Sequence, residues 1–321
     1  MDDPTLLILW LLTWLAVVVM ASRLILRKVR GQPFVMGDYL TMGALLCALV
    51  RLSLIHVVIT WGTNNMSPKL RDSTTWTPEK IYQREIGSKF AIANRVFYNT
   101  YLWLQKLVLL DITRQLIKGL HWEYPVLRTF LVVFGGSYVA VQVVTFTECD
   151  PFHHYWQVIP DPGKCSQAQV QLLTLGVLNI VTDVMLMALP IPIFFHYLRR
   201  PLLQRLHIAS LFCLGFFIVI ITVIRLPQNH NQAVSQVNRT TWASIELFVA
   251  AVAVNAPVLY TLRKGGQRMR PPPATVVELD NGPGSDTPMF PEPGPQRYDS
   301  KFTNPPVDGS TMRPATARLK R

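Results

Sequence analysis

Seven stretches of this chain are apolar over about 20 residues each, and polar or basic segments separate them. A helix of that length, at a rise of about 1.5 Å per residue, crosses the hydrocarbon core of a bilayer. Runs this long and uniform indicate helices, because the alternating strands of a membrane barrel have about ten residues. The stretches are residues 5–26, 38–61, 90–110, 126–147, 170–195, 206–226 and 242–262. The pattern predicts an all-α membrane protein built as a seven-transmembrane helix bundle.

Lysine and arginine near the ends of these stretches predict the orientation of the bundle. They concentrate after the first stretch, in the third and fifth loops, and after the last stretch. Loops rich in Lys and Arg face the cytoplasm, so the N-terminus is predicted outside and the C-terminus in the cytoplasm. The loop at residues 62–89 conflicts with this, since it is expected outside but holds five basic residues. These are Lys69, Arg71, Lys80, Arg84 and Lys89.

Composition supports a lipid environment. Half of the 321 residues are apolar and 16% are charged, well below the roughly 25% charged residues usual in soluble domains. The net charge of +12 is not a signature of nucleic-acid binding, because membrane topology already requires basic cytoplasmic segments. The lipid bilayer is therefore the expected partner, in either the plasma membrane or an endomembrane.

The cysteines fit the predicted topology. Cys149 and Cys165 fall in the fourth loop, on the predicted outer side, where an oxidising compartment favours a disulfide between them. Cys47 and Cys213 fall inside apolar stretches and are expected to act as small packing residues. The triplet that begins at Asn238 matches the N-glycosylation pattern on the same outer side.

The composition changes after residue 263. Residues 264–321 hold 11 of the 24 prolines, have no apolar periodicity, and are rich in Gly, Ser, Thr and Asp. Such a segment cannot bury enough apolar surface to offset its chain entropy. We expect a transmembrane domain over residues 1–263 and a disordered, proline-rich cytoplasmic tail over residues 264–321.

Polar and ionisable residues inside the apolar stretches are the candidate functional residues. A charge at the bilayer centre costs at least about 2.5 to 3.5 kcal/mol, so each one needs a partner or water. Two interpretations stay open beside a proton or ion relay. The residues form structural ion pairs, Asp183 with Lys106 and Glu246 with an outer arginine, or they line an outward-open cavity that binds a polar or amphipathic ligand. The candidates are Arg51, Arg95, Lys106, Asn179, Asp183, Arg225 and Glu246.

Enzyme signatures are absent from the sequence. It contains no H-E-x-x-H, no G-x-S-x-G and no glycine-rich phosphate loop, and its seven histidines do not fall at metal-ligand spacing on one helix face. No catalytic residue, metal or cofactor is therefore assigned. One enzymatic role stays open, in which Asp183 or Glu246 acts as a general acid.

A longer pattern of residues carries a family resemblance. The run NIVTDVMLMALPIP at Asn179–Pro192 is preceded by Cys149-Asp150-Pro151, Trp156 and Cys165. It is followed by Arg199, Arg205, Gly215, Arg225-Leu226 and a last helix that contains Glu246. With this pattern, residues 5–263 resemble the fungal rhodopsin-domain integral membrane proteins. That family includes receptor-like proteins of plant-pathogenic fungi and proteins encoded in mycotoxin clusters such as the satratoxin cluster.

The resemblance implies a seven-helix bundle but does not imply photochemistry. A retinal Schiff base needs a lysine within the seventh helix, and residues 242–262 contain none. Lys106 is followed by Leu107-Val108, where the family commonly has a polar residue. We therefore expect a non-photoactive, receptor-like protein that binds an unknown small ligand and signals to a cytoplasmic partner. The alternative is an accessory membrane protein or enzyme of a fungal secondary-metabolite pathway.

Overall fold

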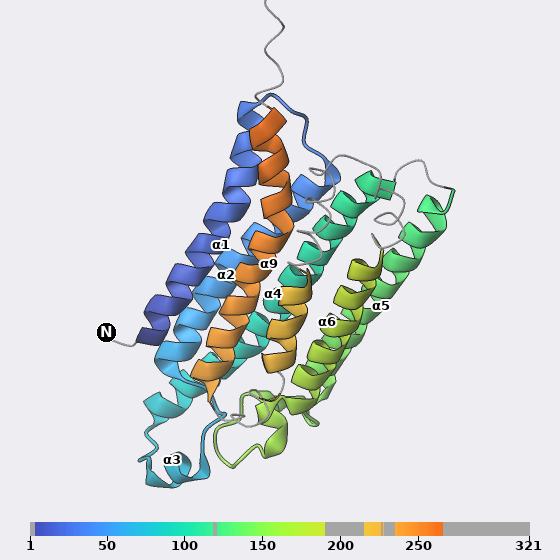
Figure 1. Ribbon diagram of the computed structural model, residues 1–321. Helices are drawn as coiled ribbons and strands as arrows, with labels where there is room; N and C mark the ends of the chain where they lie inside the picture. The colour runs from blue at the N-terminus through green and yellow to red at the C-terminus, as the bar shows by residue number, and fades with distance from the viewer. Residues whose placement is uncertain (1–3, 118–120, 190–214, 226, 228–234, 266–321) are drawn as a thin grey trace, which may run out of the picture. The chain divides into compact units, whose positions relative to one another are not determined.

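The computed structural model describes residues 4–117, 121–189, 215–225, 227 and 235–265, and these residues are helical with short connections and contain no strand (Figure 1). The long helices are α1 (Pro4–Val29), α2 (Met36–Trp61), α4 (Pro78–Ile117), α5 (Glu123–Thr147), α6 (Gln169–Ala188) and α9 (Gln236–Gly265). The short ones are α3 (Pro68–Ser73), η1 (Phe152–Tyr155) and η2 (Lys164–Gln167). The sixth apolar stretch is described over Gly215–Arg225, which is also helical.

Several expectations fall on other residues. Four of these lie outside the described part of the chain: residues 190–195 at the end of the fifth stretch, residues 206–214 at the start of the sixth, Cys213, and residues 266–321 of the expected tail.

Five of the described helices are long and apolar enough to cross a membrane: Leu6–Val29, Met36–Trp61, Glu123–Thr147, Cys165–Ala188 and Gln236–Leu262. Large apolar side chains also face outwards, among them Leu7 (70% exposed) and Val132 (68% exposed). So much exposed apolar surface indicates contact with lipid. The chain is thus an integral membrane protein whose described part is helical. The third predicted stretch, residues 90–110, lies inside the 40-residue helix α4, which carries charged residues along its length.

Helix α4 lies at the centre of the packing. It contacts α2, α5, α6 and α9, while α1 packs against α2 and α9. The main apolar core gathers side chains from these helices, including Tyr101 of α4, Phe134 of α5, Leu175 of α6 and Leu247 of α9. Because α4 contacts four other helices, its polar side chains meet partners from most of the described helices.

The connections at one end of the helices form a cap, which we define as residues 62–77 together with residues 148–168. The cap is held to α4 by a close backbone approach at two glycines. Gly62, which follows α2, has a φ of 76°, and a Cβ placed on Gly87 of α4 would lie 2.0 Å from the carbonyl oxygen of Gly62. Only glycine at position 87 therefore allows this contact.

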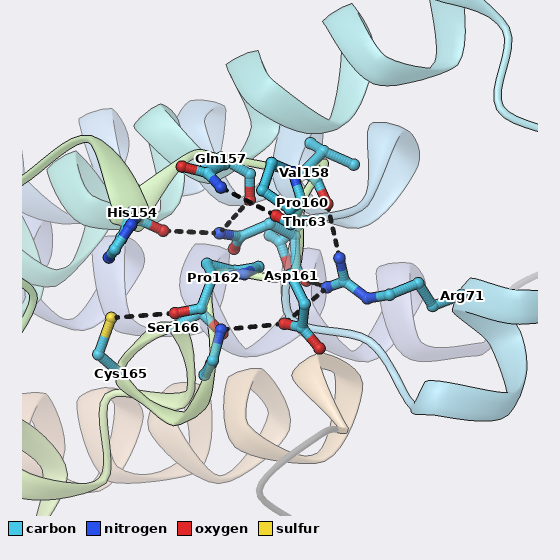
Figure 2. Close-up of polar contacts among 12 residues, drawn as sticks. Thr63, Arg71, His154, Gln157, Val158, Pro160, Asp161, Pro162, Cys165 and Ser166 are labelled. Atoms are coloured by element: carbon cyan, nitrogen blue, oxygen red, sulfur yellow. Dashed lines mark hydrogen bonds and ion pairs between the residues drawn. The ribbon is translucent and has the colours of Figure 1, made fainter.

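Hydrogen bonds join the two parts of the cap (Figure 2). The Asn64 side chain donates to the carbonyl oxygens of His154, Tyr155 and Gln157 at 3.1–3.2 Å. Arg71 donates to the carbonyl of Asn64 at 3.1 Å and lies 3.5 Å from the carboxylate of Asp161. The cap is thus a folded unit whose two segments hold each other through backbone carbonyls.

The cap also accounts for two basic residues of the loop that conflicts with the expected orientation. Arg71 bonds within the cap, and Arg84 donates to the carbonyl of Thr63 at 2.8 Å. Burial and the neighbouring charge of Arg71 lower the pKa of Arg84. These two arginines have structural partners, so their position does not depend on attraction to a cytoplasmic face.

The predicted Cys149–Cys165 disulfide is present, with its Cα atoms 5.3 Å apart. Nearby, the Tyr155 hydroxyl donates to the carbonyl of Thr145 at 2.7 Å and accepts the amides of Glu148 and Cys149. Burial raises the pKa of Tyr155, which keeps the hydroxyl protonated as a donor. The disulfide closes residues 149–165 into a loop, and Tyr155 ties that loop to the end of α5.

Candidate functional site

A buried carboxylate on α9, Glu246, is the centre of a polar network beneath the cap. One oxygen, Oε2, accepts from the guanidinium of Arg225 and the hydroxyl of Tyr98. The other, Oε1, accepts from Nδ2 of Asn179 at 2.9 Å and from Oγ1 of Thr222 at 3.3 Å. Glu246 is 1% exposed. Four donors from α4, α6 and the segment Gly215–Arg225 therefore stabilise the charged carboxylate in an interior that would otherwise disfavour it.

Asn179 of α6 links this carboxylate to a second ion pair. Its backbone carbonyl accepts from Lys106 Nζ at 3.2 Å, and Lys106 also pairs with Asp183 Oδ1. Asn179 and Asp183 are four residues apart and so share one face of α6. The other carboxylate oxygen of Asp183 is buried without a hydrogen-bond partner among the described residues. The two ion pairs thus form one connected network across α4, α6 and α9.

Two guanidinium groups lie over the ring of Tyr98. The Cζ atom of Arg225 is 5.1 Å from the ring centroid and that of Arg51 is 5.6 Å away, both within cation–π range. Arg51 of α2 also donates to Oγ of Ser244 at 3.2 Å. Its Nε and Nη1 atoms are buried and have no hydrogen-bond partner among the described residues.

A cavity of about 60 Å³ lies beside this network, under the cap. Four arginines from three helices and the segment Gly215–Arg225 line it: Arg51, Arg95, Arg225 and Arg239. The guanidinium of Arg239 donates to the carbonyl of Gln167 in η2, and this bond connects one wall of the cavity to the cap. A smaller cavity of about 30 Å³ lies along Lys106, Asn179 and Asp183. Both exceed the volume of about 10–15 Å³ that one water needs.

A separate ionic cluster lies at the opposite end of the helices. Asp38 of α2 pairs with Arg23 Nε at 3.0 Å and with Arg27 Nη1 at 2.9 Å. Arg23 also donates to Oδ1 of Asn255 at 3.3 Å, and the first-turn amide of α2 donates to Asp111 at 3.1 Å. Arg23 is 1% exposed. This cluster joins α1, α2, α4 and α9 without touching the network around Glu246.

The structure describes all seven candidate residues and brings them together beneath the cap. Five of them form the connected network: Lys106, Asn179, Asp183, Arg225 and Glu246. The other two, Arg51 and Arg95, line the adjacent cavity. Asn238 lies in the first turn of α9 with its side-chain nitrogen buried, and its glycosylation stays a prediction. Among the described residues, no group of three or more His, Cys, Asp or Glu side chains is placed to hold a metal.

Sequence reasoning missed several members of these sites. Tyr98 was not singled out, although it lies three residues after Arg95 and eight before Lys106, and this helical spacing was a usable signal. Arg239 precedes the predicted stretch at 242–262, yet it is 8% exposed within α9, which begins six residues before that stretch. Arg23 lies near the end of the first stretch, where basic residues predict the orientation of the bundle, but the structure buries it in the ionic cluster with Asp38. A single sequence gives no indication that Arg23 and Asp38, which are 15 residues apart on different helices, form a pair.

Comparison with known proteins agrees with the resemblance noted in the sequence. The profile of the fungal rhodopsin domain matches residues 22–265. The chain belongs to the fungal rhodopsin domain family. One curated relative is the polyenoic acids biosynthesis gene cluster protein Ba17b of Metarhizium anisopliae. The two sequences are 25% identical over 185 residues, which cover 56% of this chain and 48% of that protein. This fungal rhodopsin-domain chain thus spans about half the length of that relative. No solved structure matches this chain.

Proposed function

We propose that this chain is a non-photoactive, receptor-like membrane protein that binds a small ligand in the cavity beneath the cap. The observation that carries the proposal is the position of the network around Glu246, which touches the cavity through Arg225 and reaches Asp183 through Asn179. A ligand that contacts Arg225 alters its pairing with Glu246, and the change reaches α6 and α4 through shared partners. Buried charged groups inside a membrane protein mark functional sites by default.

The proposal includes seven transmembrane helices, with the N-terminus outside and the C-terminus in the cytoplasm. Five helices have the length and composition of a span, and residues 90–110 of α4 and 206–226 complete the set. The disulfide supports this orientation, because Cys149 and Cys165 then lie in an oxidising compartment. In this orientation the cap and the cavity face the outside, and signalling passes through the loop between the fifth and sixth spans and the C-terminal segment.

The alternative is an accessory membrane protein or enzyme of a secondary-metabolite pathway. It is favoured by the similarity to the Metarhizium anisopliae protein, whose name places it in a polyenoic acids biosynthesis gene cluster. In this case the cavity accommodates a pathway intermediate, and Asp183 or Glu246 acts as a general acid. A receptor changes gene expression when its cavity is blocked, whereas a pathway component changes the metabolites that accumulate.

A cavity-filling variant in a fungal host that carries the gene separates these functions. Leu172→Trp places an indole against the cavity that Leu172 lines. Leu173→Trp is the matched control, because Leu173 is the next residue of α6 and is 59% exposed on the outer surface. Immunoblotting and microscopy confirm equal amount and location of the two variants. Transcript profiles and metabolite profiles are then compared with wild type.

If the protein is a receptor, we expect Leu172→Trp to change the transcript profile and Leu173→Trp to leave it as in wild type. A pathway component predicts a changed metabolite profile without a primary change in transcripts. If Leu172→Trp matches the control in both profiles, neither function uses this cavity, and both proposals are wrong.

A further inference from the structure

The cavity beneath the cap has an excess of positive charge. Four arginine side chains line it, and two carboxylates lie close enough to act on them. One of these carboxylates, Glu246, already pairs with Arg225. The other, Glu148, acts electrostatically on Arg95, and its two oxygens accept the amides of Val170 and Gln171 at 2.9 Å and 3.0 Å. Glu246 therefore accounts for Arg225, while neither Arg51 nor Arg95 has an ion pair to a carboxylate among the described residues.

Arg51 shows most directly that this charge is uncompensated. It is 1% exposed, its single hydrogen bond is to the neutral hydroxyl of Ser244, and no carboxylate lies within ion-pair distance among the described residues. Arg95 also has a buried guanidinium nitrogen, Nη1, without a hydrogen-bond partner in the described part of the chain. The Tyr98 ring and the Ser244 hydroxyl are the neutral contacts of Arg51 given above, and a buried cation without an anionic partner is costly. An anion in the cavity would supply hydrogen-bond acceptors to both side chains.

The rest of the lining suits a ligand with an apolar portion. Leu172, Leu175 and Ala243 form part of the wall. A volume of about 60 Å³ holds a small headgroup and the first atoms of a tail rather than a large polar molecule. A guanidinium presents a planar fork of donors that matches the two oxygens of a carboxylate or phosphate.

We propose that the cavity beneath the cap binds the oxyanion headgroup of an amphiphile, either a carboxylate or a phosphate, with Arg51 and Arg95 as its partners. The apolar portion lies against Leu172 and Leu175. This inference rests on the proposed function, because it names the ligand class of the same cavity. The amphiphile comes from one of two sources, a free organic acid or an anionic lipid of the membrane, and the experiment separates them.

The test measures thermal unfolding of the full chain purified in a neutral detergent. The probes are octanoate, 1-octanol as a neutral molecule of the same length, and dioleoyl phosphatidate. The variants are Arg51→Gln and Arg95→Gln. Lys89→Gln on the same helix as Arg95 is the control, because Lys89 is 43% exposed and pairs with Glu85 outside the cavity.

We expect an anionic probe at about ten times its dissociation constant to raise the melting temperature of wild type by about 4 °C, and 1-octanol to raise it by less than about 1 °C. Arg51→Gln and Arg95→Gln each weaken binding of the anion about 10- to 100-fold, while Lys89→Gln behaves as wild type. Without ligand, Arg51→Gln melts at the same temperature as wild type or higher, because it removes an uncompensated buried cation. A loss of ligand response without a loss of stability therefore distinguishes binding from misfolding.

Each outcome decides between the sources or overturns the inference. A shift with octanoate that depends on Arg51 and Arg95 assigns a free organic acid, and one with phosphatidate alone assigns a lipid. If 1-octanol stabilises wild type as much as the anions do, or if both arginine variants keep the full shift, the oxyanion site is wrong while a ligand cavity stands. If none of the three probes shifts the melting temperature, the oxyanion site is wrong, and the comparison of Leu172→Trp with Leu173→Trp decides separately whether the cavity has a function.

Discussion

The pair of Arg225 and Glu246 offers the sharpest test of the buried network. Glu246→Gln keeps the size of the side chain but removes its charge, so Arg225 is left buried without a carboxylate. Both residues are at most 8% exposed, so water cannot replace the lost partner. Breaking a buried pair from one side costs about 3 to 5 kcal/mol. For a domain of this size we expect a fall of about 6–20 °C in melting temperature.

The second step removes both charges. The double variant Arg225→Met, Glu246→Gln removes both charges of this pair, so neither is left without the other, and the glutamine still offers an oxygen to Tyr98 and Asn179. Replacing both members of a buried pair is often neutral, so we expect the double variant to melt well above the Glu246→Gln single variant. The control is Glu85→Gln, which breaks the exposed pair with Lys89 (2.8 Å) and is expected to cost at most about 0.5 kcal/mol.

The assay is thermal unfolding of the purified proteins in one detergent, followed by near-ultraviolet circular dichroism, with wild type, two single variants and the double variant as a thermodynamic cycle. The reasoning is refuted if the double variant loses as much stability as the sum of the two single variants. That result means that the two charges act independently, and the network is then not a connected unit.

Three further perturbations test other parts of the structure. Gly87→Ala forces a Cβ to within 2.0 Å of the carbonyl oxygen of Gly62 and should lower the melting temperature markedly. The control Gly135→Ala, with open space around it, should be neutral or stabilise by up to about 1 kcal/mol. Equal melting temperatures of the two variants would contradict the close approach. Cys165→Ser removes the disulfide that spans 16 residues and should lower the free energy of unfolding by about 3 kcal/mol. Trypsin should then cleave the cap faster, and an unchanged cleavage rate would count against a structural role of the disulfide. Lys106→Met should destabilise strongly by leaving Asp183 buried without a cation, and adding Asp183→Leu should restore most of the lost stability in the same melting assay.

Parts of the network were accessible from the sequence because helix geometry converts residue number into depth. Lys106 and Asp183 lie at similar predicted depths in the bilayer, so their pairing is one of the two interpretations that the sequence supports. The structure contains this ion pair. Glu246 was matched only to an outer arginine, since three arginines lie in that half. The choice of Arg225 depends on how the helices rotate about their axes, and a single sequence does not contain that information.

The full length of α4 was not predicted for a related reason. Apolar periodicity marks only the part of a helix that lipid surrounds, so the prediction began at residue 90. The helix itself begins at Pro78, twelve residues earlier, because its first turns are polar and need no apolar face. The cap was missed as a unit, since its hydrogen bonds run from Asn64 to backbone carbonyls about 90 residues further along the chain, and backbone acceptors leave no trace in the sequence.

The length of α4 has a mechanical consequence. Forty helical residues at about 1.5 Å each make a rod of about 60 Å, roughly twice the thickness of the hydrocarbon layer. No proline follows Pro78 within it, so nothing divides the rod into separately moving pieces. Its upper turns bind the cap through Arg84 and Ser88, and its lower half carries Lys106 and Asp111. A displacement of the cap is therefore expected to tilt α4 as one rigid helix and so to move Lys106 and Asp111 in its other half.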